Sequence, residues 1–349
     1  MGYYETAAKK LESLRGRDDY YILSIESSCD ETAVAVTRGT EIISTVISSQ
    51  IEIHKRFGGV VPEIASRNHI LAIDNLVKQA LESANLTLDD ISAIAVTYGA
   101  GLLGALLVGV SYAKGLAYAR ELPLVAINHI KGHVFANFIA HKDLKTPFMC
   151  LLASGGHTEI LEVNGYFDMN TLGKTVDDAA GEAFDKAARA LGFPYPGGPQ
   201  IEEHAINGKD AVRFPRAFKG EKHLNFSYSG LKTAVINYVH TLEAKGQEVT
   251  RDDIARSFQT EAVSVLVEKS LKACKMYKQN VLCVAGGVAA NSCLREEMVK
   301  MGEKNRIKVL LPPKYLCTDN AAMIGVAAHF AIKEGIEAAP LTQDADANA

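Results

Sequence analysis

The chain has 349 residues, of which 48% are hydrophobic and 22% are charged, and its formal net charge at pH 7 is −4. This composition is typical of a soluble globular protein of about two domains and excludes a disordered chain. The acidic balance argues against a nucleic-acid-binding surface over the whole molecule, so any such surface has to be local.

The cysteines and the N-terminus indicate the compartment. The six cysteines form no C-x-x-C pair, which indicates reduced thiols rather than a disulfide framework. The charged N-terminus lacks the apolar segment of a signal peptide. The most apolar stretch, AGLLGALLVGV (100–110), is too short to span a bilayer and predicts a buried helix. We expect a cytoplasmic protein with no membrane partner.

Strands and helices alternate from residue 20 onward. Strands are expected at 20–26, 32–37, 40–49, 91–99 and 123–127. Pro62 opens an amphipathic helix whose apolar positions have helical spacing, namely Ile64, Ile70, Ile73, Leu76, Val77 and Leu81.

A pair of histidines follows the strand at 123–127. Asn128 is a good N-cap for a helix that begins at His129, and His133 then shares a helix face with His129 at about 5–6 Å. This spacing suits one divalent ion. A protease of the H-E-x-x-H type is excluded, because Ile130 occupies the position of the general base. Two histidines at this spacing alone are more often solvated or capping residues than metal ligands, and a third ligand has to come from elsewhere.

The alternation of strands and helices begins again in the second half of the chain. Strands are expected at 147–153, 159–163 and 169–173, before a helix at 179–192. SCDET (28–32) and SGGHT (154–158) each join two strands, which indicates a duplicated three-strand unit. Two such α/β lobes would face each other across a central cleft, where hairpin turns hold a nucleotide phosphate. The alternative is that both are ordinary hairpin turns.

Two glycine pairs support a ligand site. After a buried strand, Gly286–Gly287 leads into a helix expected to begin near Ala289, and such a helix start favours an anion. The G-x-G-x-x-G fingerprint is missing, which argues against a dinucleotide site of the Rossmann type. Gly197–Gly198 lies between prolines and predicts a rigid loop that lets a ligand approach the backbone, or else a plain loop.

Ten motifs occur in the order in which one family carries them. They are SIESSCDETAVAV, GGVVPEIASRNH, GLLGALLVGVSYAKGLA, NHIKGH, LLASGGHTEI, DDAAGEAFDKAARALG, YPGGP, FSYSGLKTA, VAGGVAANSCLRE and CTDNAAMIG. Together they resemble the bacterial TsaD family of tRNA threonylcarbamoyladenosine transferases, formerly described as O-sialoglycoprotein endopeptidases. The resemblance covers about residues 20–335. It implies the actin-like ATPase fold, which sugar kinases and heat-shock chaperones share.

The resemblance also implies a division of the chain. The N-terminal lobe would span 20–145 plus about 315–335 and carry the metal site. The C-terminal lobe would span 146–314 and carry most nucleotide contacts. An N-terminal extension (1–19) and a tail (336–349) lie outside these lobes.

The resemblance supplies a third metal ligand. His129, His133 and Asp319 would bind one divalent metal ion per subunit, iron in preference to zinc, and two histidines with one aspartate suit either metal. The alternative for Asp319 is a helix cap, because a helix is expected to begin at Thr318–Asp319.

The substrate-binding positions of the family also map onto this chain. They are Leu152, Ala153, Ser154, Gly155 and Gly156 at a phosphate-side turn, Asp185 and Glu202 at the ribose, and Gly198 and Asn291 beside the base and sugar. Asp30, Glu31 and His157 are weaker candidates for direct chemistry, and no general base is assigned.

The implied reaction moves a threonylcarbamoyl group from threonylcarbamoyl-AMP to N6 of adenosine 37 in tRNAs that read ANN codons, and AMP leaves. The implied protein partners are TsaB and TsaE. Two alternatives are a metal-dependent glycoprotein endopeptidase, which would need a general base near the metal, and a stand-alone actin-like ATPase or kinase. The second alternative does not explain H-x-x-x-H together with Asp319.

A basic segment runs from Lys209 to Lys232. Six basic and two acidic residues give it a local net charge of +4. Its candidates for tRNA binding are Arg213, Arg216, Lys219 and Lys222. Aromatic residues are interleaved with them, as in surfaces that stack on loop bases, namely Phe214, Phe218, Phe226 and Tyr228. The alternative is a solvated basic loop whose aromatic side chains pack inward.

Overall fold

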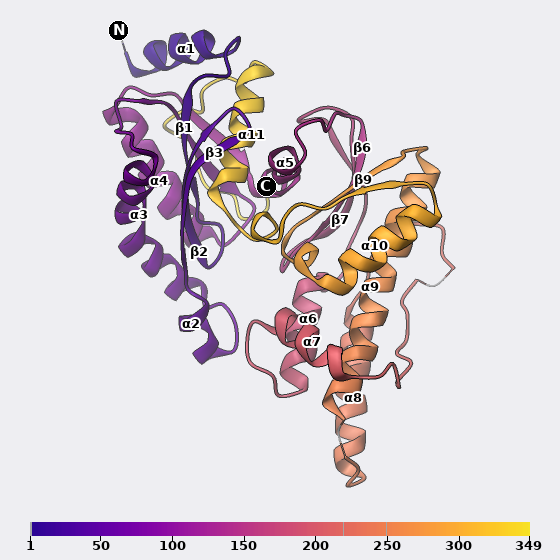
Figure 1. The fold of residues 1–349 in the computed structure, drawn as a ribbon. Coiled ribbons are helices and arrows are strands. Elements are labelled where there is room, and N and C mark those ends of the chain that lie inside the picture. The colour runs from indigo at the N-terminus through magenta and orange to yellow at the C-terminus, as the bar shows by residue number, and fades with distance from the viewer. Residues whose placement is uncertain (1, 219, 249) are drawn as a thin grey trace. The chain divides into compact units, whose positions relative to one another are not determined.

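The computed structural model describes residues 2–218, 220–248 and 250–349, which form two compact units (Figure 1). The first unit comprises Met1–Leu144 together with Asp319–Ala349, and the second comprises Lys145–Thr318. The chain therefore returns to the first unit at Asp319, after the second unit is complete.

The first unit is built on a mixed sheet. Its strands are β1 (Tyr21–Glu26), β2 (Glu31–Arg38), β3 (Glu41–Ser49), β4 (Ile91–Gly99) and β5 (Leu124–Asn128), in the order β3-β2-β1-β4-β5. Strands β1, β4 and β5 are parallel, whereas β2 pairs antiparallel with both β1 and β3. The carboxyl ends of β1, β4 and β5 therefore meet at one edge of the sheet.

Helices cover both faces of this sheet (Figure 1). The helices of the unit are α1 (Tyr3–Leu14), α2 (Ile51–His54), the 3-10 turn η1 (Lys55–Phe57), α3 (Pro62–Ala84), α4 (Leu103–Ala119), α5 (His129–Ala140) and α11 (Ala321–Lys333). Side chains alternate along a strand. Leu23 and Ile25 of β1 therefore join the core under α3 and α4, whereas Ser24 donates a hydrogen bond to Ala321 O of α11 (2.7 Å).

One face of α3 and α4 stays exposed. The helix expected to be buried at 100–110 is buried on one side only, because Leu106 and Val110 are fully buried whereas Leu103 is 51% and Leu107 is 39% exposed. Ile70 of α3, expected on the buried face, is 62% exposed beside Leu71. Both helices bury only the side that contacts the sheet, and these leucine and isoleucine side chains lie on the other side.

The second unit repeats the arrangement of the first. Its strands are β6 (Phe148–Ala153), β7 (Thr158–Val163), β8 (Met169–Lys174), β9 (Val281–Ala285) and β10 (Lys308–Leu310), in the order β10-β9-β6-β7-β8. Three antiparallel strands are again followed by two parallel ones. This repeated order is what the expected duplication of a three-strand unit requires.

The helices of the second unit surround a separate core. They are α6 (Ala180–Ala190), α7 (Gly197–Asn207), α8 (Ser229–Ala244), α9 (Arg251–Met276), α10 (Ser292–Lys304) and the 3-10 turns η2 (Gly287–Ala290) and η3 (Lys314–Leu316).

Two predicted boundaries in this unit are wrong. The helix expected near Ala289 begins at Ser292, because residues 287–290 form η2 and the Asn291 side chain then caps α10 by accepting Leu294 N (3.0 Å). Gly197, expected in a loop, is the first residue of α7, where its N–H donates to Asp185 Oδ1 (2.7 Å).

The C-terminal residues lie along β5. Ala339 N donates to Leu124 O at the start of the strand (2.8 Å), and Asn128 Nδ2 donates to Ala349 O at its end (2.9 Å). In the parts of the chain that the structure describes, we find no helix both long enough and apolar enough to cross a membrane.

Candidate functional site

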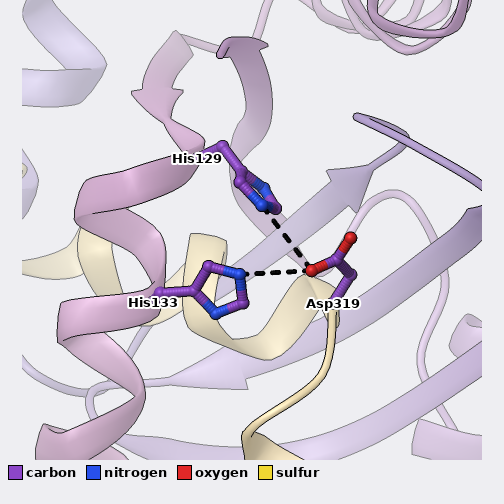
Figure 2. A group of neighbouring side chains, drawn as sticks. All are labelled: His129, His133 and Asp319. Carbon is purple, nitrogen blue, oxygen red and sulfur yellow. Dashed lines mark ion pairs between the residues drawn. The ribbon is translucent and has the colours of Figure 1, made fainter. Parts of the chain in front are cut away.

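His129, His133 and Asp319 converge in the first unit (Figure 2). The Nε2 atom of His133 lies 3.2 Å from Asp319 Oδ1, and the Nε2 atom of His129 lies 3.6 Å from the same oxygen. All three side chains offer a ligand atom within 4.8 Å of the other two. The structure thus brings together the residues that the sequence placed in two distant segments.

Local sequence explains how α5 and α11 present these side chains. The Asn128 side chain caps α5 by accepting Lys131 N (3.1 Å), so His129 and His133 stand in its first two turns. Gly132 allows close approach to α11, because a Cβ there would lie 2.7 Å from Ile324 Cδ1. Asn320, and not Asp319, caps α11 by accepting Met323 N (3.0 Å). Asp319 therefore precedes the helix and faces the histidines.

The donor set fits a divalent metal ion. Two imidazole nitrogens and one carboxylate oxygen are ligands that zinc and iron share. Among the described residues, neither ring nitrogen of the buried His133 has a hydrogen-bond partner. A buried polar atom without a hydrogen bond is costly, and an ion bound at Nε2 would give one of the two His133 nitrogens a partner. This group could therefore hold a divalent metal.

Glu26 contacts His129 of this group, and we did not expect this contact from the sequence. This carboxylate is buried at the end of β1, where Oε2 lies 3.0 Å from His129 Nδ1. The available signal was a charged residue that ends an otherwise apolar strand, because charges in such positions are almost always paired.

Charges around His129 favour its protonated form in the absence of a metal. Burial lowers the pKa of His129, but the Glu26 and Asp319 carboxylates outweigh burial and raise it to about 9. Burial raises the pKa of Glu26, yet the nearby His129 brings it below its ordinary value. A metal ligand must be an unprotonated nitrogen, so a divalent ion would displace a proton from His129.

Asp30 and Glu31 lie at the turn between β1 and β2 and at the start of β2. Burial, followed by the charges of Asp30 and Asp319, raises the pKa of Glu31 to about 9. Ser49 Oγ donates a hydrogen bond to Glu31 Oε1 (3.0 Å). Within the described ranges, the potential metal group does not include either residue. The raised pKa favours the protonated form of the Glu31 carboxyl group.

In the second unit, the turn at 154–157 follows the buried end of β6. Ser154 N donates to His157 O (2.8 Å), and His157 N donates to Ser154 Oγ (3.1 Å), which closes the turn. Gly155 and Gly156 are exposed, with open space where a side chain would stand. Leu152 and Ala153 are fully buried in β6, so their side chains pack in the core.

The other substrate candidates are held by contacts to helix starts. Asp185 on α6 accepts a hydrogen bond from the N–H of Gly197. At the next residue, Gly198, there is open space where a side chain would stand. Glu202 Oε1 on α7 accepts Ser292 N (3.0 Å), which places it beside Asn291. Asn291 also donates from Nδ2 to Gln259 Oε1 (2.8 Å).

The basic segment differs from the expected stacking surface. Phe214, Phe226 and Tyr228 are buried in the core of the second unit, so the interpretation that they stack on bases is wrong. Hydrophobic packing against α8 and α9 accounts for their burial.

The basic side chains of this segment fall into two groups. Arg216 is ion-paired with Glu261 and Glu268 (2.8 Å for Glu268), which neutralises its charge. Arg213 and Lys222 are exposed. Lys219 lies outside the described residues.

Comparison with known proteins adds a family context. The sequence model of TsaD, tRNA N6-adenosine threonylcarbamoyltransferase, matches residues 41–326. The protein of that name from Clostridium perfringens strain SM101 is 57% identical over 316 residues, which cover 90% of this chain and 93% of the relative. Its namesake from Clostridium novyi strain NT is 56% identical over 333 residues, which cover 95% and 97%.

A solved structure supports the fold. Full-length HypF in its phosphate- and nucleotide-bound form matches 92% of this chain and 47% of its own length, with a TM-score of 0.60 and 16% identity. Such low identity bears on the fold alone. The match confirms the expected actin-like ATPase fold of two α/β units.

Proposed function

The chain belongs to the TsaD family of tRNA N6-adenosine threonylcarbamoyltransferases, and we propose that its donor is threonylcarbamoyl-AMP. The acceptor is N6 of adenosine 37 in tRNAs that read ANN codons. The observation that carries this proposal is the family match over most of the chain, together with the buried His129 and His133 and the half-buried Asp319, which could hold one metal ion. The proposed location is the cytoplasm.

The reaction needs positioning more than a nucleophilic side chain. The N6 amine attacks the carbamoyl carbonyl carbon, the bond from that carbon to the phosphate oxygen breaks, and AMP leaves as the amine loses a proton. The donor is already an activated mixed anhydride, so no covalent enzyme intermediate is required. An amine on an aromatic base is a poor nucleophile, so binding and orientation have to supply most of the acceleration.

His129, His133 and Asp319 would hold one divalent metal ion, for which we propose iron in preference to zinc. When bound, such an ion supplies Lewis acidity and a template for a carbonyl or carboxylate oxygen. Asp30 lies in the same unit and is a candidate for accepting the proton that the amine loses, whereas Glu31, whose raised pKa favours the protonated carboxyl group, would act as a hydrogen-bond donor. His157 is a third candidate, in the turn after β6.

The second unit is proposed to bind the adenylate part of the donor. Backbone groups from Leu152 to Gly156 would contact the phosphate side, because Gly155 and Gly156 leave the turn open. Asp185 and Glu202 would reach the ribose, with Gly198 and Asn291 beside the base and sugar. The parallel strands β6 and β9 end beside these residues, and ligands of α/β sheets bind at such ends.

The proposal is tested by reconstitution. Purified chain, threonylcarbamoyl-AMP and unmodified tRNA that reads ANN codons are incubated with and without TsaB and TsaE, and modified adenosine is measured by mass spectrometry of digested tRNA. We expect modification only when the chain is present, with AMP released in equal amount. Modification of tRNA lacking adenosine 37, or none with all components present, would contradict the proposed substrates.

Arg213 and Lys222 are proposed to contact tRNA phosphates, together with Lys219. Replacing Arg213 and Lys222 by glutamate is expected to weaken tRNA binding and to reduce the salt dependence by up to about two phosphate contacts, each worth a slope of about 0.7 to 0.9. Binding is measured by filter retention across a salt series. Arg216 is left in place because its carboxylate partners already neutralise it.

The matched control changes the net charge by the same amount in the other unit. Lys9 and Lys10 on α1 are replaced by glutamate, which lowers the net charge equally in the other unit. If both double variants lose the same affinity, the effect is one of overall charge. If neither does, the basic segment is not a tRNA surface.

TsaB and TsaE are the proposed protein partners, and the exposed side of α3 and α4 is proposed to bind TsaB. Ile70, Leu107 and Tyr112 line an apolar groove there, and Leu71 is 80% exposed beside it. Replacing Leu71 by glutamate is expected to abolish TsaB binding in calorimetry without unfolding the chain. Ile206→Glu, at an isoleucine that is 76% exposed in the second unit, is the control. Unchanged affinity for Leu71→Glu would place TsaB elsewhere.

A further inference from the structure

Glu26 is a buried carboxylate placed directly behind a metal-ligating histidine. It is the last residue of β1, and its side chain is 1% exposed. Such a charge is costly to bury unless every oxygen is satisfied. Here Oε1 accepts Ser28 N (2.5 Å), and Oε2 accepts Thr97 Oγ1 (2.6 Å) while lying 3.0 Å from His129 Nδ1. These contacts fix the orientation of the carboxylate.

The two nitrogens of His129 face different partners. Nδ1 lies against Glu26, with Ser28 Oγ at 3.1 Å, whereas Nε2 lies 3.6 Å from Asp319 Oδ1. A carboxylate that accepts from Ser28 and Thr97 requires a donor in its third contact as well. Nδ1 therefore carries a hydrogen in the protonated and in the neutral ring, and in the neutral ring, which a metal requires, the lone pair is on Nε2.

We propose that Glu26 is a positioning residue for the metal centre, which selects the Nδ1–H form of His129 and fixes its ring so that Nε2 faces Asp319. The inference rests on the proposed metal site. Metal-binding histidines commonly donate their second nitrogen to a carboxylate, and loss of such a partner typically costs 10- to 100-fold in metal affinity. His133 offers an internal contrast, because among the described residues its Nδ1 has no hydrogen-bond partner.

A purely structural role for Glu26 is the competing explanation. Its contacts to Ser28 N and Thr97 Oγ1 link the ends of β1 and β4, and their loss would destabilise the sheet without changing His129. The test therefore needs a readout that reports on the imidazole itself. The ¹⁵N shifts of a histidine ring distinguish which nitrogen carries the hydrogen.

The main variant is Glu26→Gln in the full chain, because glutamine keeps the volume but can offer N–H where the carboxylate only accepts. Zn²⁺ and Co²⁺ are titrated into chelator-treated protein. We expect affinity to fall by about 10- to 100-fold and the Co²⁺ absorption bands to change. In metal-free protein at a pH high enough to leave the ring neutral, we expect His129 to populate the Nε2–H form. Ser44→Ala is the control, because it also removes a buried hydrogen bond from a strand of the same sheet, here to α3 (Ser44 Oγ to Ala80 O, 2.6 Å).

The outcomes separate this inference from the metal site itself. If the wild-type chain binds Zn²⁺ and Glu26→Gln binds it equally, with unchanged ¹⁵N shifts, Glu26 is structural and the inference is wrong. If the wild-type chain binds neither ion, the metal site and the inference both fail. Should Glu26→Gln not fold, Thr97→Val removes one donor to Oε2 and is expected to shift the same spectra to a smaller extent; unshifted spectra would again overturn the inference.

Discussion

Replacing both His129 and His133 by alanine is expected to remove bound divalent metal and to reduce threonylcarbamoyl transfer below detection, while the chain stays folded. Two of the three ligand atoms disappear, and an isolated carboxylate at Asp319 cannot retain the ion against solvent. Removing His129 costs the buried Glu26 carboxylate one partner and lowers the stability, but the hydrogen bonds from Ser28 N and Thr97 Oγ1 to that carboxylate remain, so we expect the fold to be retained. Elemental analysis, circular dichroism and the tRNA assay measure the three quantities.

The matched control is His329→Ala, at another buried histidine of the same unit, which pairs with Tyr20 (2.9 Å) away from the metal group. It should keep both metal and transfer. Asp319→Asn is expected to retain part of the metal, because an amide oxygen remains as a neutral ligand. Undiminished metal in the double histidine variant would show that the ion binds elsewhere.

Replacing Gly286 by alanine is expected to abolish adenylate binding in the second unit and to leave metal binding unchanged. Gly286 has a φ of +87° and a ψ of 165°, a conformation that costs other residues about 1–3 kcal/mol. Its Cβ would also lie 2.4 Å from Ala153 O. The end of β6 must then move, and the turn at 154–157 moves with it.

The neighbouring glycine provides the control for this prediction. Gly287 has open space where a Cβ would stand and no positive φ, so Gly287→Ala should bind a non-hydrolysable threonylcarbamoyl-AMP analogue almost normally. Calorimetry measures binding, and elemental analysis measures metal content. An equal loss in both variants would mean that side-chain bulk beside the ligand matters, and not the position of β6. Normal binding in Gly286→Ala would remove the turn from the proposed site.

The sequence predicted those features of the fold and the site that depend only on neighbouring residues. The Asn128 cap and the four-residue histidine spacing are set within one helix, and both appear as expected. The repeated strand pattern predicted two α/β units, because hydrophobic alternation is also local. The family resemblance supplied Asp319, since nothing near that residue distinguishes a metal ligand from a cap.

Features that depend on distant contacts were missed. Glu26 meets His129 across 103 positions of sequence, and the only local trace of this contact is a charge at the end of an apolar strand. The aromatic residues of the basic segment read as surface groups because polar neighbours flank them, yet Phe226 is fully buried. The sequence of the basic segment does not show that α8 and α9 cover its aromatic side chains. It also does not show that Glu261, a distant residue, neutralises Arg216.

The path of the C-terminal residues matters for how the protein is purified. Ala349 accepts a hydrogen bond from Asn128, the residue immediately before His129, so an oligohistidine tag joined after Ala349 would start beside the metal group and offer competing imidazoles. Metal analyses of such a fusion would report on the tag as well as on the protein. Tyr3 instead contacts Leu122, near the opposite end of β5, about 20 Å from Asn128 at strand spacing. An N-terminal tag is therefore the better choice.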